Sequence, residues 1–257
     1  MKDAASSSIY GSRAANGVVL ITTKKGVAGQ SEFNFNMYEG FSQVPRERYY
    51  DLMNTEQYQD YMKDYYKILQ EKDPNATIPD QIFSNSNVNT DWQDAIFRNA
   101  GTRSYELSAR GGSEKTQYYT SVGYMKQGGV LLGSDFNRLS GRINLNHQHN
   151  DKLRFSTAIN LTRAVNKRVQ EENSKEGATK SGIFSPPNLT VYDASGNFAY
   201  DQVRLTRENP VAMLTLPTNE AETFRVLANV GAEYNIIPEL LPVSYTHLRA
   251  HETVLDL

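Results

Sequence analysis

The segment Phe224-Arg-Val-Leu-Ala-Asn-Val-Gly-Ala-Glu-Tyr-Asn-Ile236 decides the fold class, because its apolar and polar residues alternate. The apolar set falls on even positions: Phe224, Val226, Ala228, Val230, Ala232, Tyr234 and Ile236. Successive side chains of an extended strand point to opposite faces, so a period of two separates the two sets. The segment therefore predicts a β-strand with one apolar and one polar face.

Five further segments show the same alternation: Ser31–Val44, Arg103–Arg110, Thr116–Lys126, Arg138–His149 and Lys152–Arg163. Most are longer than the five or six residues usual in globular sheets, and they match the 9 to 11 residues of a tilted membrane strand. Short turns are expected at Gly111-Gly112, Asn150-Asp151 and Pro238-Glu239, and longer connections lie between them. Outer-membrane barrels have this asymmetry of short turns and long loops. We therefore expect an all-β chain, a partial transmembrane antiparallel barrel of about six strands.

Composition excludes several classes of protein. The 257 residues include no cysteine, which removes disulfides, thiolate catalysis and Cys-based zinc sites. A formal net charge of -2 disfavours nucleic-acid binding. No apolar run approaches the roughly 18 residues of a membrane-spanning helix. A mean hydropathy of -0.59 still permits membrane strands, whose alternation averages to a polar value.

Two long connections differ in their expected structure. In Asp51–Lys72 the residues Tyr58, Met62, Tyr65 and Leu69 recur at helical spacing, with Asp51 or Asn54 as the N-cap, so a helix is predicted. A further short helical turn is expected at Asp91–Phe97. The connection 165–221 contains Pro186-Pro187, Pro210 and Pro217, and it is predicted to be irregular surface structure.

The first 26 residues have a different sequence pattern. Lys2–Tyr10 predicts a short helix, and the continuous apolar run in Val18–Thr23 predicts a strand buried on both faces. The stretch Gly11–Gly17 is not a phosphate-binding loop, because five residues separate its glycines and Val18 follows where Lys-Ser/Thr is required.

Ile9-Tyr-Gly-Ser-Arg13 and Ala15–Gly26 closely resemble the end of the plug domain of SusC/RagA-type TonB-linked outer-membrane proteins. The signature residues are Tyr10, Gly11, Ser12, Arg13, Asn16 and Gly17, and Ala14 stands where the family usually has glycine. Further matches in the family's order are Tyr50–Tyr58, Thr90–Asp94, Ser108–Lys115 and Gly133–Phe136.

The resemblance implies a fragment of a nutrient importer of the cell outer membrane. It divides the chain into residues 1–27, the end of a plug domain, and 28–242, the first part of a β-barrel with a helical extracellular loop. Its implied partners are the TonB-ExbB-ExbD energy-transducing complex, a SusD-like surface lipoprotein and outer-membrane lipid. The imported ligands are oligosaccharides or peptides. Such a receptor displaces its plug and is not an enzyme, so no cofactor, metal or catalytic residue is expected.

Both ends of the chain receive a separate interpretation. Residues 243–257 contain Val243–Thr253, which resembles a translated transposase adapter, so they are interpreted as a sequencing-adapter artefact and left out of the fold prediction. The pair His247 and His251 beside Glu252 then carries no information about metals. Met1 is interpreted as an internal methionine, which accounts for the absence of a signal peptide.

Several residues have competing interpretations. Tyr58, Tyr61, Tyr65 and Tyr66 are candidate contacts for a ligand or partner, although packing of the loop onto the barrel rim is favoured. His147 and His149 resemble half a metal site, and Glu171, Glu172 and Glu176 an acid cluster, but solvated surface groups are favoured for both. The sequons at Asn75, Asn160 and Asn188 are expected by chance in an Asn-rich chain.

Strand parity predicts that the polar face points into the lumen and touches the plug. Its residues are Arg138, Arg142, Asn144, Asn146, Arg154, Asn160 and Arg225. Two alternative functions stay open. A secreted β-sandwich that binds glycans would need two packed sheets of shorter strands. An outer-membrane hydrolase would need a Ser/His pair or paired carboxylates, which the sequence does not show.

Overall fold

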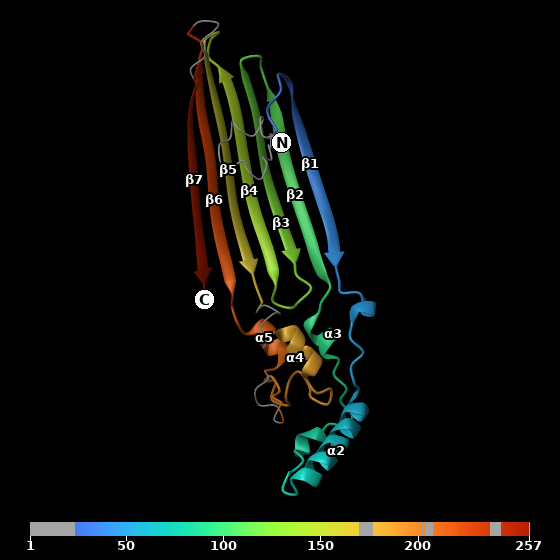
Figure 1. The fold of residues 1–257 in the computed structure, drawn as a ribbon. Helices are drawn as coiled ribbons and strands as arrows, with labels where there is room; N and C mark the ends of the chain where they lie inside the picture. The colour runs from blue at the N-terminus through green and yellow to red at the C-terminus, as the bar shows by residue number, and fades with distance from the viewer. Residues whose placement is uncertain (1–23, 170–176, 202, 204–207, 237–242, 257) are drawn as a thin grey trace, which may run out of the picture.

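One antiparallel sheet dominates the computed structural model, which describes residues 24–169, 177–201, 203, 208–236 and 243–256. Seven strands lie in chain order from β1 to β7, and each pairs with the strand before it. Their bounds are β1 Gly29–Ser42, β2 Ala100–Gly112, β3 Thr116–Gly128, β4 Asp135–Gln148, β5 Leu153–Lys167, β6 Glu220–Tyr234 and β7 Val243–Asp256. Figure 1 shows a tall sheet with the helices gathered beyond one end. The sheet is open, with β1 and β7 at its edges.

The predicted fold class is confirmed, and the six expected strands correspond to β1 to β6. The β2 strand is longer than the predicted Arg103–Arg110, because Ala100–Thr102 also pair with β1. A seventh strand occupies 243–256, the segment left out of the prediction. An open sheet edge can pair through main-chain hydrogen bonds with almost any segment that lacks proline. The pairing of β7 therefore does not test the adapter interpretation, which stays a prediction. The described residues form one sheet, and the two packed sheets of a β-sandwich are not found among them.

The register separates an apolar face from a polar face across the sheet. One row of paired positions contains Phe35, Leu107, Val122, Gly141, Leu161 and Val226. The adjacent row on the opposite face contains Asn34, Ser108, Ser121, Arg142 and Asn160. Large side chains of the apolar face, such as Phe33 and Ile143, stay exposed. No other part of the described chain covers this face.

A mostly polar row bounds the apolar face at the end near the helices. Toward the helices, paired positions place Glu39, Arg103, Lys126, Asn137, Val165 and Glu222 in one row. Toward the short turns, the row of Thr116 and His147 continues into Phe155 and Ala232, so it is polar only on β3 and β4. On β4, Asn137 and His147 are ten positions apart, which is about 33 Å along the strand. With the strand tilt of about 40° that outer-membrane barrels have, this length on β4 would correspond to a height of about 25 Å.

The helices belong to the long connections at one end of the sheet (Figure 1). Two short 3₁₀ turns, η2 Arg46–Arg48 and η3 Asp80–Ile82, flank α2 Thr55–Lys72, which begins after the N-cap Asn54 as expected. The α3 helix, Trp92–Ile96, confirms the predicted helical turn. Tyr65, expected on the apolar stripe of α2, is exposed instead. The packing partners Ile78, Ile82 and Val203 contact the side of the stripe that carries Tyr58, Met62 and Tyr66.

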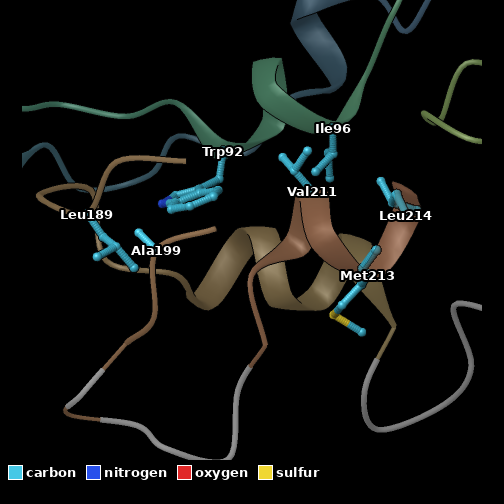
Figure 2. Packing of buried hydrophobic residues seen from close by; sticks show 8 residues of the cluster. Trp92, Ile96, Leu189, Ala199, Val211, Met213 and Leu214 are labelled. Carbon is cyan, nitrogen blue, oxygen red and sulfur yellow. The ribbon is translucent and has the colours of Figure 1, made fainter. Parts of the chain in front are cut away.

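The prediction of irregular structure for 165–221 is wrong in two places. The segment contains α4, Ala178–Phe184, and α5, Pro210–Thr215. Both helices pack with α3 around the buried cluster drawn in Figure 2, which includes Trp92, Ile96 and Val211. Asn209 caps α5 through hydrogen bonds from the backbone N–H groups of Val211 and Ala212. Two connections far apart in sequence therefore share one small core beyond the rim of the sheet.

Candidate functional site

A cleft of about 610 Å³ opens between the two connections. Its walls are the segment 50–54 with the first turns of α2, the segment 89–93 at the start of α3, and the segment 183–187 after α4. None of these segments belongs to the sheet. The position of the cleft therefore depends on contacts that tie each wall to the next.

A buried glutamine fixes the first wall. The Gln93 side chain is 5% exposed. Its Oε1 accepts a hydrogen bond from the Tyr50 backbone N–H at 2.9 Å, and its Nε2 donates to the Tyr50 carbonyl at 2.9 Å. This paired contact resembles a step of a β-ladder and holds Tyr50 against α3.

The start of α2 is fixed by a capping box. The Asn54 Oδ1 accepts from the Gln57 backbone N–H at 2.9 Å, and the Gln57 side chain accepts from the Asn54 backbone N–H at 3.0 Å. The Thr55 backbone N–H donates to Asn89 Oδ1 at 3.0 Å, which links α2 to the segment before α3. These bonds satisfy N–H groups that a helix start leaves without partners.

The third wall is tied to α3 by two hydrogen bonds. Trp92, only 1% exposed, donates from its indole Nε1 to the Pro186 carbonyl at 3.0 Å. The Thr90 backbone N–H donates to the Pro187 carbonyl at 2.8 Å. Two residues of a proline-rich segment that would otherwise be irregular are thereby held in place.

A charged cluster adjoins the cleft at the N-terminus of α3. The Arg46 guanidinium binds both carboxylate oxygens of Asp94, at 2.7 and 2.8 Å, and its Nη1 lies 3.7 Å from Asp91. Hydrogen bonding to Asp94 raises the pKa of Arg46 above its usual value. Burial, and then the charge of Asp94, raise the pKa of the Tyr49 phenol. The Arg46 guanidinium is thus paired with the carboxylates of Asp91 and Asp94.

The four candidate tyrosines of α2 separate into two pairs. Tyr58 is buried in the cluster with Met62 and Ile82, and Tyr66 packs against that cluster. Tyr61 and Tyr65 are 53% and 48% exposed. Tyr61 lines the cleft together with Tyr58, whereas Tyr65 lies outside it with its ring edge-on to Tyr66.

A second region of interest lies on the polar face of the sheet, near the short turns. A cavity of about 530 Å³ there is lined by Lys25, Asn144, Arg154 and Glu233, among others. Asn144 is buried, and its Nδ2 donates to the Lys24 carbonyl at 2.7 Å. Gly26 passes directly over the backbone of Tyr118. The residues that follow the predicted plug strand therefore contact the polar face, as parity predicted for Asn144.

Other residues singled out in the sequence have different surroundings. The plug signature Tyr10–Gly17 and the glutamates at 171, 172 and 176 lie outside the described residues. His147 Nδ1 is hydrogen-bonded to Thr116 Oγ1 at 2.8 Å. Asn188 is buried, and its side-chain amide donates to the carbonyls of Gln81, Ile82 and Ser84. The amide nitrogen of this sequon is therefore used in internal hydrogen bonds. Within the described ranges, no cluster of acidic and histidine side chains is suited to a metal ion.

Sequence reasoning missed the structural roles of Gln93 and Asn188, two of the buried amides that organise the loops. Both hydrogen-bond to backbone that is remote in sequence, so no local pattern marks them. None of the helices in the described parts of the chain has the length and hydropathy needed to cross a membrane.

Comparisons with known proteins agree with this architecture. The chain is 28% identical over 261 residues to the TonB-dependent receptor SusC of Bacteroides thetaiotaomicron, covering 93% of this chain and 25% of the relative. It is 34% identical over 230 residues to TonB-dependent receptor P26 of Formosa agariphila, covering 88% of this chain and 22% of the relative. It thus spans about a quarter of the length of these curated relatives. No family model matches.

Among solved structures, the chain resembles the RagAB peptide importer in its closed-closed state, with a TM-score of 0.77 and 24% identity over 98% of this chain and 31% of that one. The open-open state of the same importer gives a TM-score of 0.74 at 24% identity. These likenesses establish the fold. Together with the curated relatives, they identify the chain as part of a SusC/RagA-type TonB-dependent receptor.

Proposed function

We propose that the whole protein is a nutrient importer of the outer membrane, energised by a TonB-ExbB-ExbD complex and paired with a SusD-like surface lipoprotein. Its ligands are oligosaccharides or peptides. The observation that carries the proposal is the separation of the two faces of one long-stranded antiparallel sheet, with large apolar side chains such as Phe33 and Ile143 exposed on one of them. Relatives named TonB-dependent receptors support it.

The division of the chain follows the same proposal. Residues 1–27 form the end of the plug, 28–242 form the first part of the barrel, and 243–257 are the adapter-derived segment. The apolar face contacts lipid, and the polar face lines the lumen. The contact of Asn144 with Lys24 supports this orientation, because Lys24, which precedes β1, bonds to a residue of the polar face.

Transport in this proposal requires movement and no covalent step. Energy transmitted through TonB displaces the plug and opens a polar route along the lumenal face. The long connections with their helices lie on the outer side, where ligand and lipoprotein arrive. The cleft between those connections is the place where this chain first meets a ligand.

Deleting the complete gene in the bacterium that carries it tests the proposed function. We expect loss of growth on one oligosaccharide or peptide source while growth on free glucose and amino acids continues. Complementation with the whole gene should restore growth, and complementation without the TonB-interacting segment should not. Unchanged growth on every oligosaccharide and peptide source would contradict the proposal.

A further inference from the structure

Three exposed aromatic rings surround the cleft beyond the sheet. Tyr50, Tyr61 and Phe184 are 64%, 53% and 49% exposed; the two tyrosines belong to the wall formed by 50–54 and α2, and Phe184 belongs to the wall after α4. Exposed aromatic rings leave apolar surface in contact with water. A ligand with a flat apolar face can cover that surface. The rings therefore favour a ligand with apolar faces.

Polar groups of the same cleft are left for a ligand. The Asn54 and Asn89 side chains use their Oδ1 atoms in the capping contacts, so their Nδ2 groups keep donor capacity. The Asp51 carboxylate makes no hydrogen bond or ion pair with any described residue. The cleft thus offers donors and an acceptor beside its aromatic rings.

The charge of the lining excludes one class of ligand. Asp51 and Asp91 line the cleft, and among the described residues that line it there is no lysine, arginine or histidine. The adjoining Arg46 is already paired with Asp94 and Asp91. A ligand that carries carboxylate, sulfate or phosphate groups would bring negative charge next to these carboxylates, with no cation in the described lining to offset it, at a cost in binding energy.

From these three observations, we propose that the cleft binds an uncharged oligosaccharide. The C–H faces of its sugar rings cover Tyr50, Tyr61 and Phe184, its hydroxyl groups donate to Asp51, and its oxygens accept from the amides of Asn54 and Asn89. The hydrogen bonds of Gln93, Asn54 and Trp92 hold the walls in place before binding, which lowers the ordering cost. This assignment rests on the proposed function and narrows its ligand class.

The test uses the full-length receptor, purified in detergent and probed on an array of uncharged gluco-, manno-, xylo- and arabino-oligosaccharides. Oligogalacturonides and tryptic casein peptides serve as the anionic and peptide probes. We expect binding to at least one uncharged oligosaccharide. The variant Tyr61→Ala should weaken that binding about tenfold, which corresponds to loss of about 1.4 kcal/mol. Asp51→Asn should weaken it less, because an amide oxygen still accepts hydroxyl donors.

Matched controls come from the same helix. Tyr65→Ala removes an equally exposed tyrosine outside the cleft, and Asp64→Asn removes an exposed carboxylate outside it. Both should leave binding unchanged. Equal effects of Tyr61→Ala and Tyr65→Ala would overturn the assignment, as would binding only to oligogalacturonides or only to peptides, or to no probe.

The two proposals fail in different ways. If the receptor binds an uncharged oligosaccharide through Tyr61 but deletion of its gene leaves growth unchanged, the importer function is contradicted and the assignment of the cleft is supported. If deletion of the gene abolishes growth but Tyr61→Ala does not change oligosaccharide binding, the importer function is supported and the assignment of the cleft is contradicted.

Discussion

Gly26 lies directly against the backbone of β3. A Cβ atom at this position would lie 2.3 Å from the Tyr118 backbone nitrogen, far inside any normal contact, and the obstructing atoms belong to a strand in the middle of the sheet. The strand cannot give way without losing its hydrogen bonds. Only glycine fits here, for reasons of space.

We therefore predict that Gly26→Ala destabilises the full-length receptor by about 1 to 3 kcal/mol, the usual cost of overpacking. The measurement is the thermal midpoint of the purified receptor in detergent. Gly141→Ala is the control, because a Cβ on that strand residue meets nothing within 4 Å. Equal midpoints for the two variants would show that the segment around Gly26 is free to move off β3.

Gln93 supports a second prediction at the scale of one residue. Gln93→Ala leaves the Tyr50 backbone N–H and carbonyl without their partners, at a cost of about 1 to 3 kcal/mol for the half-buried groups. We expect faster proteolytic cleavage in the segment 43–54 of the full-length receptor. Gln70→Ala, which removes one exposed hydrogen bond to Ala76, should leave that cleavage rate unchanged.

At this scale, prediction from the sequence succeeded where the signal was periodic and failed where it was not. The parity of Ile143 and Asn144 predicted correctly that they occupy different faces of the sheet, because alternation is a property of the strand itself. The role of Gln93 depends on a partner 43 residues away. A single sequence contains no trace of such a pairing.

Among the elements, α2 is the one whose start was predicted from capping chemistry. Asn54→Ala removes the side-chain acceptor for the Gln57 N–H and should destabilise the helix by about 1 kcal/mol. Faster hydrogen exchange at the first turn of α2 in the full-length receptor is the expected result. Asn75→Ala, in the exposed turn after the helix, is the control. Identical exchange in both variants would contradict the capping role.

The strands and α2 were predictable because each is long enough for its periodicity to show. The α4 and α5 helices have 7 and 6 residues, which is less than two full turns, and their stability comes from Trp92 and Ile96 of another connection. Short helices that depend on a shared core cannot be recognised from local pattern. The cleft that the end of α4 helps to form was therefore beyond prediction, although Tyr61, a candidate contact residue from the sequence, is among the residues that line it.

For the whole chain, the open sheet leads to a prediction about solubility. Seven strands are fewer than the eight of the smallest outer-membrane barrels, and the two edges and the apolar face lack partners. Expressed alone in water, the chain should aggregate through these edges and this face. Size-exclusion chromatography and thermal melting test this. A monomer that is soluble and melts cooperatively would contradict both the membrane orientation and the partial barrel.

The strict chain order of the sheet has a consequence for how such a wall is built. Every strand pairs with the strand that precedes it in the sequence. Each strand can therefore be added to the edge formed by the strand before it. Closure of the intervening loops costs little more when they are long, since the entropic penalty grows only logarithmically with length. Connections of very different size can therefore be inserted at the end of the sheet that carries the helices without changing the order in which strands pair. The architecture allows these connections to vary in length and sequence while the strand order of the sheet stays the same.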